Sequence, residues 1–221
     1  YVTYGDIESI LRDAFQSSNG KPTVIAAYVD PRFEATVRML DAVIAANGGT
    51  HIELGEGDGM LADPYFPKFQ RVSPSLWRAL VAHYDFIVRY RDVLYEPRWY
   101  QGVQGRVRVG GEPASEHPEP GRVHGVLHQS LAAMRQVLSL INLTSATSVE
   151  WQKPQPGPRV LTGLEVSLAV EALPQAVWWA SPDNPALGPE PLEARVVHGE
   201  EFRVEFTLPR LEYWSIVVLE Y

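Results

Sequence analysis

Two short runs, Pro22-Thr23-Val24-Ile25-Ala26-Ala27-Tyr28 and Thr50-His51-Ile52-Glu53-Leu54, decide the fold class of the first part of the chain. The first is continuously apolar and follows a turn, which is typical of a strand buried on both faces. Helical spacing of apolar residues surrounds the two runs, over residues 4–16, 33–44 and 73–95. The order helix, strand, helix, strand, helix predicts a parallel α/β sheet.

The second part of the chain loses the helical period at Trp99. Residues 99–121 are rich in Gly, Pro and Glu, which predicts a linker or an irregular segment. Short apolar stretches separated by turn sequences then follow, at residues 123–128, 135–143, 164–171, 177–180, 202–208 and 213–221. This pattern predicts an antiparallel β-sandwich over residues 122–221, after an α/β part over residues 1–98.

Composition excludes several classes of protein. The 221 residues carry a formal net charge of -8, which disfavours sequence-independent binding to nucleic acid and docking on an anionic membrane. The chain has no cysteine, so disulfides, thiolate nucleophiles and cysteine-ligated metals are excluded. No apolar run reaches the length of a membrane-spanning helix, which is roughly 18 residues.

The segment after the second predicted strand concentrates acids and glycines. Glu53, Glu56 and Asp58 alternate there with three glycines, at the carboxyl end of a strand, where α/β barrels carry their active sites. Carboxylates accept hydrogen bonds from sugar hydroxyls, and a pair of them can perform acid/base chemistry. The alternatives are that Glu56 and Asp58 are solvated turn acids, and that Glu53 is either buried with a partner or lines the mouth of a barrel.

Aromatic residues close to this segment are further candidates. Tyr28 ends the first predicted strand, where its side chain either points into the mouth of the barrel or packs in the core. Tyr65 either offers its ring as a stacking surface for a sugar or anchors the loop. Trp178, Trp179 and Trp214 are expected in the sandwich core, with a carbohydrate-binding face as the alternative. Acidic loops also bind Ca²⁺, but the ligand spacing of an EF-hand is absent, and we predict no metal site and no cofactor.

The acidic segment also carries a resemblance. Glu53-Leu54-Gly55-Glu56-Gly57-Asp58-Gly59-Met60-Leu61, followed by Tyr65-Phe66-Pro67, resembles glycoside hydrolase family 66, the endo-dextranases and cycloisomaltooligosaccharide glucanotransferases. The similarity extends through residues 26–28, 40–44 and 83–90, and more loosely through residues 140–143, 177–183 and 211–214.

The resemblance implies a fold and an activity. The chain would form the C-terminal part of a (β/α)8 catalytic barrel followed by a β-sandwich, in a retaining glycosidase that acts on α-1,6-glucan (dextran). The family's catalytic Asp/Glu pair would lie upstream of this chain, so no catalytic residue is assigned here and the chain alone is expected to be inactive. The alternative is a non-catalytic module for α-glucan binding or for assembly.

Substrate, partners and location follow from the same resemblance. Tyr28, Glu53, Glu56, Asp58 and Tyr65 are the candidate substrate-binding residues, and the expected ligand is an α-glucan polysaccharide or an isomalto-oligosaccharide. The open edge of an incomplete barrel would pair with the missing N-terminal half or with a second copy of the chain. An extracellular location is expected because a polymeric substrate cannot enter cells.

Overall fold

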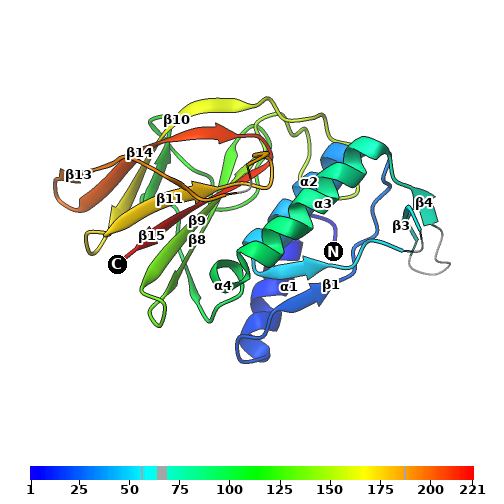
Figure 1. Ribbon diagram of the computed structural model, residues 1–221, viewed down its shortest axis with the longest axis horizontal. Helices are drawn as coiled ribbons and strands as arrows, with labels where there is room; N and C mark the ends of the chain where they lie inside the picture. The colour runs from blue at the N-terminus through cyan, green and yellow to red at the C-terminus, as the bar shows by residue number, and fades with distance from the viewer. Residues whose placement is uncertain (56, 64–68, 187) are drawn as a thin grey trace.

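The computed structural model describes residues 1–55, 57–63, 69–186 and 188–221. The longer helices and a two-stranded parallel sheet lie at one end of the molecule, and two larger antiparallel sheets lie at the other (Figure 1). No helix in the described ranges combines the length and the apolar composition needed to cross a bilayer.

The first end contains the predicted alternation of helices and strands. In chain order its elements are α1 (Tyr4–Ser17), β1 (Thr23–Ile25), α2 (Glu34–Ala46), β2 (Gly49–His51) and α3 (Pro74–Arg89). Strands β1 and β2 pair in parallel, with Ile25 opposite His51, as the sequence predicted. Both strands are shorter than predicted, so Glu53 lies after β2 and not within it.

Local hydrogen bonds fix where the helices begin. Thr3 caps α1 in a capping box, in which its hydroxyl accepts the amide of Asp6 and the Asp6 carboxylate accepts the amide of Thr3. Ser73 accepts the amide of Leu76 at 3.1 Å and so caps α3, as predicted.

Two features of this end differ from the prediction. The third helix breaks at Tyr90 and resumes as the short helix α4 (Arg91–Leu94), and the break places the Tyr90 ring 5.8 Å from that of Trp178 in the second end. The acidic segment leads into a hairpin of β3 (Gly59–Leu61) and β4 (Phe69–Arg71). Strands of three residues are too short to show alternation of apolar and polar positions, so the sequence did not indicate them.

The second end is a sandwich of two antiparallel sheets, as predicted. The six-stranded sheet has the order β12-β11-β15-β9-β8-β5 and the five-stranded sheet has the order β13-β14-β10-β6-β7. Their long strands are β8 (Val123–Ser130), β9 (Arg135–Asn142), β10 (Leu161–Val170), β11 (Ala176–Ala180), β13 (Ala194–His198), β14 (Phe202–Leu211) and β15 (Trp214–Glu220), and β12 is Glu190–Pro191.

The segment 99–121, predicted as a linker or irregular segment, contributes to both sheets. It contains β5 (Trp99–Gln101), which pairs with β8, β6 (Val107–Val109), which pairs with β10, and β7 (Glu112–Pro113), which pairs with β6. These strands have two or three residues and lie at or beside a sheet edge, so glycine and proline in the connections dominated the sequence pattern.

Two hydrophobic cores share the six-stranded sheet. On one face, Ile141 and Ile216 pack against the helices, and on the other, Leu140 and Val217 pack against the five-stranded sheet. Trp179 is buried in the core between the two sheets, as predicted, whereas Trp214 and the partly buried Trp178 pack in the core between the six-stranded sheet and the helices. Helix α2 contacts both β2 and β9, which explains why eleven of its thirteen residues are buried.

Candidate functional site

The carboxyl ends of β1 and β2 lie side by side, because the strands are parallel. The amide of Ile52 donates to the carbonyl of Ile25 at 2.9 Å, so the segments that follow both strands leave the sheet together. Tyr28 follows β1 and is half-buried, and its carbonyl accepts the side-chain amide of Gln152 at 3.3 Å. The parallel pair therefore brings Tyr28 and the acidic segment to one edge of the sheet.

The acidic segment folds back on itself. The amide of Leu61 donates to the carbonyl of Glu53 at 2.7 Å, and the amide of Gly55 donates to the carbonyl of Gly59 at 2.9 Å. A Cβ atom on Gly55 would lie 1.9 Å from the ring of Phe69, so any other residue there would displace that ring. Gly55 thus has a structural reason in addition to any role in binding.

The candidate residues have different surroundings. The side chain of Asp58 is 62% exposed and its Oδ2 lies 2.9 Å from Nε of Arg71, itself exposed. This matches the description of a turn acid and leaves the carboxylate accessible from solvent. Glu56 and Tyr65 lie outside the described residues.

Glu53 is buried with partners, one of the two alternatives that the sequence left open. Its Oε1 accepts the hydroxyl of Tyr84 at 2.8 Å, and its Oε2 lies 3.4 Å from Nδ1 of His51. Only 1% of the residue is exposed. Glu53 therefore supports the start of the acidic segment from inside the molecule.

His51 joins Glu53 to a second acid, Asp41, on the buried face of α2. Its Nε2–H donates to the carbonyl of Ala27 at 2.7 Å, and its Nδ1 lies 2.8 Å from Oδ1 of Asp41. The sequence analysis did not single out Asp41. The sequence did contain a signal for it, since an acid inside the otherwise apolar run of residues 39–46 requires a buried partner.

The charges of this cluster depend on one another. Burial raises the pKa of Asp41, and the nearby charge of Glu53 raises it further. Burial also opposes the ionised forms of Glu53 and His51. The attraction of His51 nevertheless lowers the pKa of Glu53, and the attraction of Asp41 and Glu53 raises the pKa of His51.

Asp41, His51 and Glu53 are the only His, Asp or Glu residues in the described part of the chain whose ligand atoms group closely enough to hold a metal ion.

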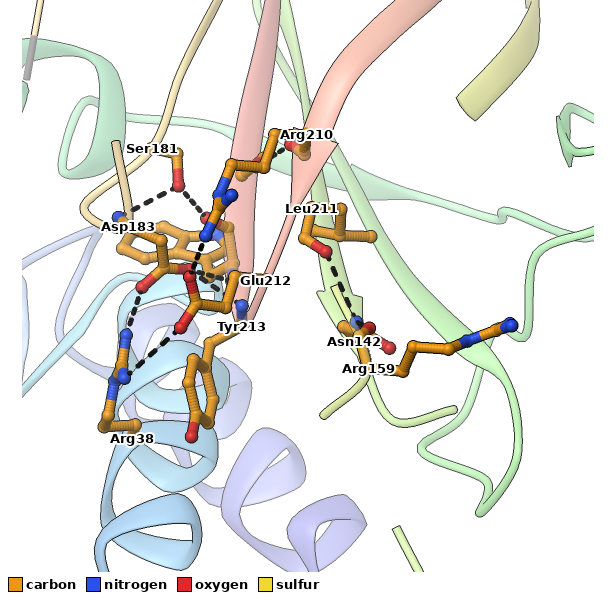
Figure 2. A network of polar contacts seen from close by, with 11 residues as sticks. Arg38, Asn142, Arg159, Ser181, Asp183, Arg210, Leu211, Glu212 and Tyr213 are labelled. Carbon is orange, nitrogen blue, oxygen red and sulfur yellow. Dashed lines mark hydrogen bonds and ion pairs between the residues drawn. The ribbon is translucent and has the colours of Figure 1, made fainter. Parts of the chain in front are cut away.

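A polar network attaches the sandwich to α2 near this cluster (Figure 2). Nη2 of Arg38 lies 2.7 Å from Oδ1 of Asp183, and Nη1 lies 3.5 Å from Glu212. The guanidinium also lies over the ring of Tyr213, 3.7 Å from its centroid. Oδ2 of Asp183 accepts the amides of Tyr213 and Trp214, at 2.8 and 2.9 Å.

A second polar network joins α1 to the same sheet. Oε1 of Glu8 lies 2.7 Å from Nε2 of His124 on β8 and accepts the side-chain amide of Asn47 at 3.0 Å. Burial raises the pKa of Glu8, but His124, Arg12 and Asn47 outweigh that effect and lower it. The helices and the sandwich are thus connected at two separate buried points.

The comparisons with known proteins agree with this geometry. The sequence model of glycosyl hydrolase family 66 matches residues 1–218. The chain belongs to this family. The match includes both β1–β2 with their helices and the sandwich, and it confirms the family resemblance of the acidic segment.

Two relatives extend well beyond this chain. Two cycloisomaltooligosaccharide glucanotransferases of Niallia circulans are 30% identical over 192 residues and 29% identical over 195 residues. Each alignment covers 85% of the chain but 20% of the relative, so the chain spans about a fifth of their length.

A solved structure has the same fold over most of the chain. It is a cycloisomaltooligosaccharide glucanotransferase of Paenibacillus sp. complexed with cycloisomaltoheptaose. It matches with a TM-score of 0.78 and 29% identity, covering 89% of this chain and 28% of that structure.

Proposed function

We propose that this chain is the C-terminal portion of a retaining family 66 glycoside hydrolase that acts on α-1,6-glucan. Family membership supports a glycosidase, and the activity of the relatives as cycloisomaltooligosaccharide glucanotransferases supports isomalto-oligosaccharides as the substrate class. In this proposal the catalytic Asp and Glu lie outside the 221 residues, about 5 Å apart across the scissile bond, the separation typical of retaining enzymes.

The parallel pair β1–β2 carries the proposal. Val24 on β1 is 57% exposed and Ile52 after β2 is 52% exposed, although helices cover the opposite face of the sheet. Apolar side chains on a parallel sheet are normally covered on both faces. In a (β/α)8 barrel, further strands would cover this face, and α2 and α3 would form part of the outer ring.

The rim of that barrel would bind the glucan. Tyr28, Glu56, Asp58 and Tyr65 would contact glucose units through hydrogen bonds or ring stacking, and Glu53 would hold the segment in place. The substrate is a polymer, so we also propose that the protein acts outside the cell.

The alternative is a non-catalytic module for glucan binding. A groove on the outer face of the five-stranded sheet is lined by polar side chains, among them Arg108, Glu165, Ser167 and Thr207. The one ring that lines it, Phe206, is 4% exposed and offers no stacking surface, so the sugar platform common in such modules is absent from this described groove. The observations favour the enzyme portion.

The test is to compare the 221 residues alone with a protein that also carries the preceding coding sequence. Dextran is incubated with both, and linear and cyclic isomalto-oligosaccharides are separated by chromatography. Turnover is expected only with the longer protein, and turnover by the 221 residues would refute the placement of the catalytic pair. Titration of both proteins with isomalto-oligosaccharide covers the alternative, because binding without turnover in either protein would support a module.

The rim residues are tested in the longer protein. Tyr28→Ala and Asp58→Ala are expected to raise the KM for dextran several-fold while leaving the fold intact by circular dichroism. Glu119→Ala is the control, because Glu119 forms an exposed ion pair with Arg122 and lines neither the rim nor the groove of the alternative. Unchanged kinetics in both rim variants would remove these residues from the substrate site.

A further inference from the structure

Two buried carboxylate–imidazole pairs occur in the described part of the chain, and they differ in one respect. Glu8 faces His124 and also has Asn47 and Arg12 as partners. His51 faces two carboxylates, of Asp41 and Glu53, with no Lys or Arg in an ion pair with either. The first pair is complete as it stands, and the second has two carboxyl groups for one imidazole.

Two oxygens of the second cluster have no hydrogen-bond donor among the described residues. Oδ2 of Asp41 and Oε2 of Glu53 are buried and accept no hydrogen bond from any described residue. Leaving a buried carboxylate oxygen without a donor costs on the order of 1–3 kcal/mol, and more when the group is charged. A cation between the two acids would use both oxygens.

The imidazole is oriented as metal-bound histidines usually are. Its Nε2–H donates to the carbonyl of Ala27, so the ring is fixed by a backbone acceptor and Nδ1 faces the acids. Nδ1 and oxygens of the two carboxylates all lie within 4.8 Å of one another. Ligand atoms that lie at about 2.0–2.2 Å from one tetrahedral ion are roughly 3.3–3.6 Å apart, which is within this limit.

The donor set selects the kind of ion. One imidazole nitrogen and two carboxylates suit Zn²⁺ or Mn²⁺, whereas Ca²⁺ prefers an all-oxygen shell. A divalent ion with two carboxylates and a neutral imidazole has no net charge, which suits a buried position. Asp41 also lines a cavity of about 20 Å³, which is large enough for one water molecule.

We propose that Asp41, His51 and Glu53 form a structural site for a divalent transition-metal ion, with Zn²⁺ as the best fit. The ion would join α2 to the segment after β2 and so fix the start of the acidic segment. At most 6% of any of the three residues is exposed, so the ion would enter as the chain folds and exchange slowly afterwards. The inference does not depend on the glycosidase activity.

The experiment measures metal retention and stability without any substrate. The protein is unfolded in guanidinium chloride with a chelator, refolded with Zn²⁺, with Ca²⁺ or with no divalent ion, and desalted. Metal content is measured by mass spectrometry and Tm by calorimetry. We expect one Zn²⁺ per chain, no retained Ca²⁺, and a Tm several degrees higher for the Zn²⁺ sample.

Two variants assign the ion to this cluster. Asp41→Asn preserves side-chain volume but removes a ligand charge, and we expect it to lose Zn²⁺ and the Tm increase. Glu8→Gln alters the other buried carboxylate–imidazole pair and is expected to retain both. Should Asp41→Asn not refold, the unaltered protein still decides the question: refolding without retained Zn²⁺ and without a change in Tm overturns the proposal, as does retention by Asp41→Asn.

Discussion

Arg38 and Asp183 are 145 positions apart in the sequence, yet Nη2 of the first lies 2.7 Å from Oδ1 of the second. The contact joins α2 to the loop after β11 (Figure 2). Asp183 also accepts two backbone amides at the start of β15, so one side chain links the helix to two segments of the sandwich. The pair therefore aligns the two ends of the molecule.

Asp183→Ala is expected to lower the free energy of unfolding by about 2–4 kcal/mol, because a partly buried guanidinium and two amides lose an acceptor. Urea unfolding followed by tryptophan fluorescence measures the change. The control is Glu205→Ala, which breaks the exposed pair with Arg195 and should cost less than about 1 kcal/mol. Equal losses in the two variants would show that the buried network does not stabilise the attachment.

The exposed face of β1–β2 gives a test of the barrel. Ile52→Asp is expected to change the stability of the 221 residues by less than about 0.5 kcal/mol, because the side chain already faces solvent. In a longer protein with a complete barrel, the same change would bury a charge and lower Tm markedly.

The matched control for this test is Leu40→Ala. Leu40 is fully buried between α2 and its neighbours, so the variant should lose about 2–5 kcal/mol in both proteins. A small effect of Ile52→Asp in the longer protein would mean that no barrel strand covers this face.

Local signals in the sequence predicted much of the first end. The capping residue Ser73 and the apolar spacing of three helices depend on neighbours within one or two turns, and these predictions are confirmed. The helix break at Tyr90 was missed because it coincides with packing against Trp178, a contact between residues distant in the chain.

The candidate site was predictable only where one segment carries it. The acidic segment was visible in the sequence because its acids and glycines are consecutive. The cluster of Asp41, His51 and Glu53 was not, because it forms only when α2 packs across the end of β2. Likewise, β13 has no buried residue by which alternation could indicate a strand.

Glu8 gives the protein a specific acid sensitivity. Its pKa in the folded state lies below the ordinary value of 4.5, so its stabilising contribution is complete above about that pH and is lost as the pH falls through the folded-state value. Glu8→Gln should therefore be less stable than the unaltered protein at pH 7, by about 1–3 kcal/mol, and the difference should shrink on acidification. Urea unfolding of both proteins from pH 7 to pH 3 measures this difference.

The surface control for acid sensitivity is Glu119→Gln, which removes an exposed ion pair with Arg122. Its effect at pH 7 should stay below about 1 kcal/mol. A stability difference between Glu8→Gln and the unaltered protein that stayed constant from pH 7 to pH 3 would contradict the lowered pKa of Glu8.

Two tyrosines test how strongly the buried Glu53 stabilises the acidic segment. The Tyr84 hydroxyl lies 2.8 Å from Oε1 of the buried Glu53, whereas the Tyr100 hydroxyl donates to the neutral carbonyl of Asn47, also at 2.8 Å. Tyr84→Phe leaves a buried carboxylate oxygen without its donor and should cost about 1.5–3 kcal/mol, against about 0.5–1.5 kcal/mol for Tyr100→Phe. Hydrogen exchange should also accelerate at the amides of Gly55 and Leu61 in Tyr84→Phe only. Equal costs with unchanged exchange at both amides would mean that Glu53 does not support the segment.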